Sequence, residues 1–465
     1  MGIRSPIHGS DLWSSIDAPR PIGKSPGVPM MRLVVRHPIP FCLRYRVVLE
    51  CSPHRARAPG KGFMQSTSGD KHGLATAARV WTGNLILLAA SNFMVSFGTG
   101  LVNGASTNFF VNILGLSGAQ VLWLAGIREI PGLILMFIAA LIMHLPLSRR
   151  AAVSVLLMGL GYGLYALVHS YAALIAMALI ASLGFHNWLP LGSSLALGLA
   201  GKERAGRVMG VLSSVNALAS IVGVGTIAVL SRLLPLRGFF AAGGLLMVVA
   251  AVLLVPLPTK LGETKKAQPR LLFRRRYWLY YVLTLFEGSR TQVFGTFGTL
   301  VLVQEYGLDA RGISLLLLAS SLVNFLAAPL MGHLLDRVGE RFTLAASYVL
   351  LALCFVGYAT VHNAWFLGAM LIGINLLVML SIGLSTYVHR LAPPEELTPT
   401  LSTGVSVNHI TSVTMSLLAG TLLKVVGYEN LCWGAATIIM LSVPFALAIR
   451  ARPAMVLQRG PVAAK

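Results

Sequence analysis

The stretch MGHLLDRVGER, residues 331–341, decides the fold of this chain, because it places a charged turn between two long apolar runs. The run before it spans residues 312–335, and the run after it spans residues 342–361. About 20 apolar residues cross the hydrocarbon core of a bilayer, so each run is long enough to be a transmembrane helix. Within the turn, Gly339 is expected to permit a tight bend and Gly332 to let two helices approach closely.

The composition extends this interpretation to the whole chain. Of its 465 residues, 55% are hydrophobic and 11% are charged, and the mean hydropathy is +0.75. Soluble domains carry about 25% charged residues, and a transmembrane β-barrel would show alternating polarity in segments of about ten residues. The sequence therefore predicts an all-α, multi-pass membrane protein. The net charge of +22 does not indicate nucleic-acid binding, because the charges gather at the ends of apolar runs.

Twelve apolar runs are predicted to span the membrane. They cover residues 81–104, 119–143, 150–168, 171–198, 207–231, 238–257, 277–303, 312–335, 342–361, 363–388, 400–424 and 430–450. The loops on one side of these runs contain most of the Lys and Arg residues, including Arg274, Arg275 and Arg276. Because basic loops stay in the cytoplasm, this asymmetry predicts cytoplasmic termini and a location in the cell membrane.

The two halves of the chain resemble each other. YALVHSYAALIAM at 165–177 matches YATVHNAWFLGAM at 358–370 at an offset of 193, and SVNALAS at 214–220 matches SVNHITS at 406–412 at an offset of 192. Six crossings return the chain to the side on which it started, so both copies enter the membrane in the same orientation. We therefore expect two six-helix bundles related by a pseudo-two-fold axis along the membrane normal.

These patterns divide the chain into segments. The first bundle is expected at 76–258, a cytoplasmic linker at 259–276, the second bundle at 277–452 and a cytoplasmic tail at 453–465. Residues 1–75 are basic, poor in acids and without a run long enough to span a membrane. An organelle transit peptide has such a composition, but we favour a disordered tail or an upstream start codon, with Met64 as the true first residue.

The turn at 331–341, the twelve spans and the repeat together resemble the major facilitator superfamily, whose signature loop reads G-x-x-x-D-R-x-G-R/K-R/K. The matching residues are Gly332, Asp336, Arg337, Gly339 and Arg341, while Glu340 replaces a basic residue. Asp336 and the arginines are expected to make charge-assisted hydrogen bonds to helix ends. The resemblance covers residues 80–450 or so, and implies the fold of that family and secondary transport of a small solute.

Three features depart from the patterns of that family. In the equivalent loop of the first half, at 140–150, Ala140 and His144 stand where a glycine and an aspartate are expected. The fourth span has no arginine and the fifth has no Gly-Pro motif, although drug–proton antiporters of the family usually carry both. In the family this loop helps to hold the cytoplasmic side closed, so the first departure predicts a weaker closure in the first half. The other two departures disfavour a multidrug antiporter.

An acid and a base lie inside the seventh apolar run. Glu287 is about 15 Å along the helix from Tyr277 at 1.5 Å per residue, which is near the midplane, and Arg290 lies on the same helical face. A charge at that depth costs from about 2.5 kcal/mol upward, so both side chains should face the bundle interior or a water-filled cavity. We favour a place on the substrate or proton pathway, with a structural ion pair as the alternative.

Arg128 and Glu129 form a second charged pair, inside the second run. Adjacent residues point about 100° apart on a helix, so one side chain is expected to reach a neighbouring helix while the other faces the cavity. The alternative is a shallow pair that extends its charges to the outer interface. Weaker pathway candidates are His186, for which we favour packing, Asn216 and Asn408, for which we favour interhelical hydrogen bonding, and His409, Asn103 and Asn375.

Nothing in the sequence predicts a cofactor, a metal site or an enzyme. The four cysteines, Cys42, Cys51, Cys354 and Cys432, lack the spacing of metal ligands. There is no G-x-x-x-x-G-K-[ST] motif to hold ATP phosphates and no acidic cluster of the kind that holds Mg²⁺.

The sequence thus predicts a secondary active transporter that moves a small organic solute by alternating access and is coupled to protons. Two basic residues in candidate cavity positions favour an organic anion or zwitterion as the solute. Protons and the lipid bilayer are the other expected partners, and the protein is expected to be a monomer. Two alternatives stand beside this reading: a non-transporting sensor or scaffold of the same fold, and a facilitator that moves its solute without an ion.

Overall fold

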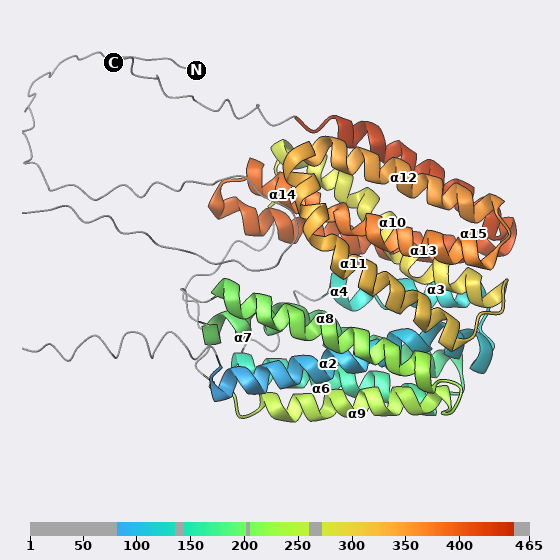
Figure 1. Cartoon of the computed structure of the whole chain (residues 1–465). Coiled ribbons are helices and arrows are strands. Elements are labelled where there is room, and N and C mark those ends of the chain that lie inside the picture. The colour runs from blue at the N-terminus through green and yellow to red at the C-terminus, as the bar shows by residue number, and fades with distance from the viewer. Residues whose placement is uncertain (1–80, 135–143, 201–204, 260–271, 451–465) are drawn as a thin grey trace, which may run out of the picture. The chain divides into compact units, whose positions relative to one another are not determined.

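The structure, a computed structural model, describes residues 81–134, 144–200, 205–259 and 272–450. The predicted segments 1–75 and 453–465, most of the predicted linker, and residues 135–143 of the second span lie outside the described residues. All regular elements in the described ranges are helical (Figure 1). The fold class predicted from the apolar runs is therefore confirmed.

The first half of the chain forms a bundle of helices. Its elements are α2 (Gly83–Asn108), the π-helical η1 (Phe109–Ile113), α3 (Gly118–Ile127), α4 (Ile130–Leu133), α6 (Leu147–Gly163), η2 (Leu164–Leu167), α7 (Tyr171–Ala200), α8 (Ala205–Leu230) and α9 (Leu236–Leu254). Helix α2 packs against α8 and α9, and α6 packs against α7 and α9. Small residues allow this close packing: a Cβ atom added at Gly161 of α6 would overlap the backbone of Ala181 in α7.

The second half repeats the arrangement. Its elements are η3 (Arg275–Tyr277), α10 (Trp278–Gln304), α11 (Ala310–Val338), α12 (Glu340–Thr360), α13 (Ala364–Val378), η4 (Met379–Ser381), α14 (Ile382–Leu391) and α15 (Pro394–Leu447). Inside α15, Gly427 has φ 77° and ψ 174°, which is not helical. It divides α15 into two limbs, 394–426 and 428–447, that correspond to the predicted eleventh and twelfth spans.

Nine helical segments in the described ranges are long and apolar enough to cross a membrane. Helix α15 counts once among them although it contains two limbs, and the charged α10 is not among them. Helices α3 and α4 are the described part of the second predicted span. With these three additions, the helices match the twelve spans predicted from the sequence.

The pseudo-two-fold axis is visible in contacts between equivalent residues. The hydroxyl oxygens of Thr107 in α2 and Thr299 in α10 lie 3.0 Å apart, and these residues are 192 positions apart in the chain. That separation equals the repeat offset of the sequence, and a residue can meet its own equivalent only at the axis. Elsewhere, Ser96 donates to Asn216 at 3.3 Å, and their equivalents Gly288 and Asn408 are also in contact.

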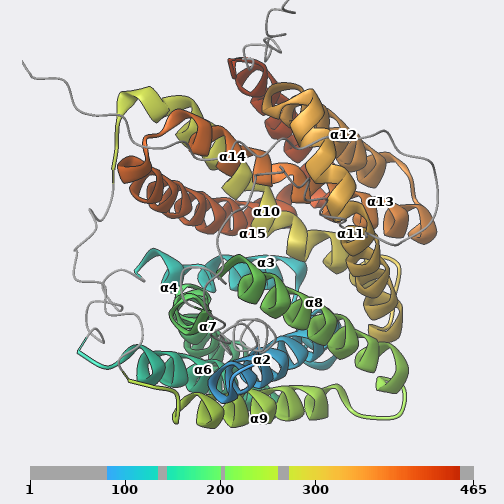
Figure 2. The ribbon, with the colours of Figure 1, turned by 60° about the vertical axis from the view of Figure 1, so that its left-hand side comes forward.

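Two helix pairs join the halves, and the pseudo-two-fold axis relates one pair to the other. Helix α3 packs against α15, and α8 packs against α11 (Figure 2). Hydrogen bonds between the halves gather near the loop at 305–309: the Asn108 side chain donates to the Leu308 carbonyl at 2.8 Å, and Arg232 pairs with Asp309 at 3.1 Å. We call this the 305–309 end of the protein, which the charge asymmetry predicts to face outward.

The signature turn has the expected bend but not the expected close packing. Helix α11 ends at Val338, and Gly339 follows with φ 81°, a value that favours glycine. The prediction for Gly332 is wrong, because a Cβ atom there would meet nothing within 4 Å. A side chain at this position would point into open space, so no close packing of helices depends on Gly332. Arg337 lies in the last turn of α11, where its charge complements the helix dipole.

The residue that departs from the signature has a partner of its own. Glu340 is 2% exposed and pairs with Arg390 of α14 at 3.1 Å. An acid at this position therefore joins the start of α12 to the end of the tenth span. A basic residue, as the family pattern has it, would face Arg390 instead.

Candidate functional site

A break in the second span positions the candidate site. Within the second span, predicted over residues 119–143, α3 ends at Ile127 and α4 begins at Ile130. Pro131 has no N–H group to bond to the Ile127 carbonyl, and its ring crowds that carbonyl, which favours an interruption of the helix here. Helix α7 supports the break, because the Ser182 hydroxyl donates to the backbone carbonyl of Arg128.

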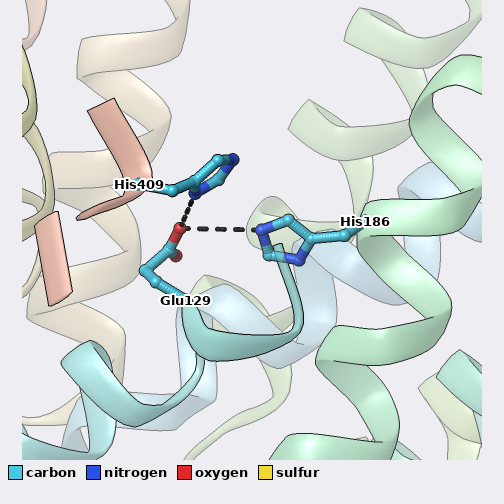
Figure 3. A group of neighbouring side chains, drawn as sticks. All are labelled: Glu129, His186 and His409. Atoms are coloured by element: carbon cyan, nitrogen blue, oxygen red, sulfur yellow. Dashed lines mark hydrogen bonds and ion pairs between the residues drawn. The ribbon is translucent and has the colours of Figure 1, made fainter. Parts of the chain in front are cut away.

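Arg128 and Glu129 leave this break in different directions. The Arg128 guanidinium donates to the Tyr162 hydroxyl of α6 at 3.2 Å and so stays within the first half. The Glu129 carboxylate lies toward α7 and α15 (Figure 3). The two adjacent side chains do diverge as the helical geometry predicts. Both residues are partly buried.

Glu129 joins the two halves through two histidines. Its Oε2 atom lies 2.9 Å from Nδ1 of His409, which is in α15 of the second half. The same oxygen lies 3.6 Å from Nε2 of His186, which is in α7 of the first half. The centres of the two imidazole rings are 5.0 Å apart and their planes are inclined at 61° (Figure 3). We call these three residues the Glu–His–His cluster.

The hydrogen bonds of His186 determine which of its nitrogens carries hydrogen. Its Nδ1 lies 3.0 Å from the Ser182 carbonyl and 3.2 Å from the Ser182 hydroxyl oxygen. That hydroxyl already donates to Arg128, so both neighbours of Nδ1 are acceptors. Nδ1 therefore donates, and in the neutral ring the lone pair of Nε2 faces the Glu129 carboxylate.

A second cluster lies inside the second half. Glu287 and Arg290 of α10 form an ion pair, and the Arg290 guanidinium lies 4.1 Å from the centre of the Tyr348 ring in α12. Glu287 is 8% exposed and Arg290 is 4% exposed. Both side chains therefore face the interior of the bundle, as the cost of burying a lone charge requires.

Arg290 also borders a cavity of about 240 Å³ between α10 and both limbs of α15. The wall is mostly apolar and includes Phe294, Phe297, Met415 and Leu422. Within the described part of the chain, the Nε and Nη1 groups of Arg290 have no hydrogen-bond partner. A charged donor therefore lies at the edge of an apolar space.

The remaining polar candidates lie outside both clusters. Asn216 bonds to Ser96 of α2, and Asn375 donates to Ser320 of α11 at 3.3 Å. Both are hydrogen bonds between helices, which is the alternative that we favoured for Asn216. The Asn408 side chain accepts from Ser412 on its own helix, and Asn103 is exposed on α2.

Sequence reasoning missed the partners of the charged residues. Tyr162 contacts the partly buried Arg128, Tyr348 contacts the buried Arg290, and Ser182 orients His186. The only available signal was that a buried arginine needs hydroxyl or aromatic neighbours. Since these partners lie on other helices, no local pattern identifies them.

The chain is similar to one known protein family. The family model described as Major Facilitator Superfamily matches residues 88–301 and 281–463. A search of curated proteins by sequence finds no match.

Solved structures of several transporters are similar to this chain. The nucleoside transporter NupG superposes with a TM-score of 0.65 at 14% identity, over 79% of this chain and 98% of that one. A POT family transporter in complex with a thioalcohol-conjugated peptide gives 0.63 at 12% identity, over 78% and 95%. A bacterial homologue of the iron transporter ferroportin, in an inward-facing state, gives 0.63 at 18% identity, over 79% and 99%.

Identities this low establish the fold and nothing about the solute. The family match, in contrast, covers most of the chain and agrees with the signature turn, the repeat and the helix count. The chain therefore belongs to the major facilitator superfamily, whose members are normally not enzymes, and it is a multi-pass membrane transporter that moves a solute across a membrane.

Proposed function

We propose that this transporter moves a small organic anion or zwitterion together with protons, with Glu287 as the proton carrier and Arg290 as the anion-binding group. The observation that carries the proposal is the buried ion pair between these two residues in the middle of α10. Two charges in a low-dielectric interior are tolerated only while each has a partner. If one of the two charges is neutralised, binding of a new ion of opposite charge beside the other becomes more favourable.

Protonation of Glu287 supplies such an event. Once neutral, Glu287 no longer balances the Arg290 guanidinium, which then favours an anion in the neighbouring cavity. The carboxylate of a solute would restore the lost charge balance, and the apolar wall would accept its hydrocarbon part. Proton and anion thus favour each other's binding, and a transporter with this linkage carries them in the same direction.

The arrangement of the halves supports alternating access. The contacts between Asn108 and Leu308 and between Arg232 and Asp309 close the 305–309 end. If that end faces outward, as the basic loops predict, the protein is closed to the outside in this conformation. Tilting of one bundle against the other about the shared axis would then open it.

Transport in proteoliposomes tests the proposal. A thermal-shift screen against small carboxylates and zwitterions first identifies a solute, and its uptake is then measured with an imposed pH gradient. We expect uptake to follow the gradient in the wild type and Glu287→Gln to lose that dependence. The matched control is Glu305→Gln, an exposed acid at the end of the same helix.

Other outcomes select among the alternatives. If Glu287→Gln transports with unchanged pH dependence, Glu287 does not carry the proton. Flux that ignores a collapsed gradient would indicate the uncoupled facilitator. A solute that stabilises the protein but is never transported would favour the sensor or scaffold.

A further inference from the structure

We infer that Glu129, His186 and His409 bind a divalent transition-metal ion that bridges the two halves of the transporter. This site is separate from the Glu287–Arg290 pair and does not depend on its proposed role. Two imidazole nitrogens and one carboxylate oxygen form a donor set suited to Zn²⁺, and also to Fe²⁺, Co²⁺ and Ni²⁺. Three protein ligands leave at least one coordination position open.

The distances in the cluster fit such an ion. The three ligand atoms all lie within 4.8 Å of one another. With bonds of about 2.1 Å, the 2.9 Å and 3.6 Å separations from the Glu129 oxygen correspond to angles of roughly 90° and 120° at the ion. The first angle is near that of an octahedral site and the second is wider than the tetrahedral angle, so an ion fits after small movements of the side chains.

The fixed orientation of His186 is a second, independent indication. Because Nδ1 donates to Ser182, the Nε2 lone pair is directed at the negatively charged carboxylate of Glu129. Two acceptors that face each other repel, and a cation between them removes the repulsion. Ligating histidines typically donate their other ring N–H to a carbonyl in this way, which fixes the tautomer and the ring.

A proton on Nε2 is a poorer solution than a metal ion. The separation of 3.6 Å between Nε2 and Oε2 exceeds the 2.7–3.2 Å range of N–H···O hydrogen bonds. A metal ion bonded to both atoms spans that separation without strain.

The backbone near the cluster leaves room for both rings. A Cβ atom added at Gly132 would lie 2.7 Å from Cδ2 of His186 and 3.0 Å from Cε1 of His409. Any larger residue would push the rings apart or out of the site. Glycine at this position therefore keeps the three donors close together.

The ligands come from both halves, which gives the ion a conformational effect. Glu129 and His186 belong to the first half and His409 to the second, so the ion binds best while α15 lies against α7 and the α3–α4 break. By mass action, a bound ion stabilises the conformations in which these elements meet. Saturating metal is thus expected to hold the transporter in its present state.

Metal binding to the purified full-length chain in detergent tests this inference without any solute. After treatment with a chelator, the protein is titrated with Co²⁺, whose visible absorption reports the ligand geometry, and then with Zn²⁺ as competitor. We expect one equivalent of Co²⁺ with nitrogen and oxygen ligands. Glu129→Gln, His186→Ala and His409→Ala should each weaken this binding by at least about tenfold.

His362→Ala is the matched control, since His362 also lies beside a glutamate, Glu429 at 2.8 Å, but on an exposed surface. This variant should bind Co²⁺ as the wild type does. Gly132→Ala leaves all three donors in place and should still weaken binding, which separates loss of the site from loss of a ligand. Size-exclusion elution confirms that each variant is folded.

Two results would overturn the inference. One is Co²⁺ binding that the three ligand variants leave unchanged; the other is the absence of any bound equivalent when Co²⁺ is in large excess over the protein. Glu287→Gln should bind Co²⁺ normally, so failure of the proton proposal and failure of the metal site give different patterns.

Discussion

Thr107 and Thr299 occupy the same position in the two copies of the repeat, and their hydroxyl oxygens lie 3.0 Å apart. They connect α2 to α10 between the middle of these helices and the 305–309 end. Since each is the equivalent of the other, the contact marks the axis about which the two halves would tilt. Access from the 305–309 end requires the helices around this contact to separate.

A disulfide between these positions should therefore form readily. We expect Thr107→Cys combined with Thr299→Cys to cross-link under mild oxidation, because hydroxyl groups in contact place the Cβ atoms near the range that a disulfide needs. With a protease site inserted into the linker, the two fragments should stay joined without reductant and separate with it. The single variants, which retain Cys354 and Cys432, serve as controls. Fragments that separate in both conditions would contradict the observed contact.

The two glycines of the signature turn should respond oppositely to alanine. Gly339 adopts φ 81° and ψ 163°, a region nearly restricted to glycine, so Gly339→Ala is expected to destabilise by about 1–3 kcal/mol. Gly332 is helical with open space around it, so Gly332→Ala should stabilise by up to about 1 kcal/mol. Thermal unfolding in detergent measures both. A loss of stability in Gly332→Ala would show a close contact at that residue.

The Glu340–Arg390 ion pair predicts a cost for restoring the family pattern. Glu340→Lys should lower the unfolding temperature more than Glu340→Gln, because the new ammonium group would be buried against Arg390. Removing one partner of a buried pair costs about 3–5 kcal/mol, and Glu340→Gln should fall near the lower limit since Arg390 is 30% exposed. Glu429→Gln is the control, because it removes an exposed acid paired with His362. Equal stability of Glu340→Lys and the wild type would refute the pairing.

Acid should weaken the contact at the 305–309 end. The N–H group of Gly312, and then Arg232, lower the pKa of Asp309 below its ordinary value of 3.8. A carboxyl group with a lowered pKa stabilises the folded state above 3.8, and that contribution is lost as the pH falls through the lowered pKa. The effect is small, because Asp309 is about half exposed.

Comparison with Asp309→Asn isolates this contribution. The amide still accepts a hydrogen bond at the start of α11 but does not titrate. Between about pH 5 and pH 3, the wild type should lose slightly more thermal stability than the variant. Parallel losses in the two proteins would show that Asp309 is not responsible.

Much of the fold can be predicted from the sequence, because the thickness of the bilayer sets the length of each membrane-spanning helix. Apolar runs long enough to cross the bilayer predicted the helices, and the repeat predicted the axis. The break in the second span was less predictable, since Pro131 can bend a helix or interrupt it. The packing at Gly332 was predicted wrongly, because a glycine that matches a family pattern need not lie at a close helix contact.

The clusters show a similar limit for the site. Glu287 and Arg290 are three positions apart on one helix, so helical geometry predicts their pairing. Glu129 and His409 are 280 positions apart, and only the packing of α3 against α15 brings them together. No spacing in the sequence contains that information, which is why Glu129 and His409 were not predicted to meet.

The break between α3 and α4 limits how far the halves can slide at mid-depth. Arg128 and Glu129 are successive residues whose Cα atoms are about 3.8 Å apart, yet one is anchored to Tyr162 and the other to His409. A displacement of α15 by more than a side chain's reach must either detach His409 or drag the turn away from α6. The contacts Arg128–Tyr162 and Glu129–His409 therefore cannot both persist in a widely opened transporter. Separation of the bundles must break one of these two contacts.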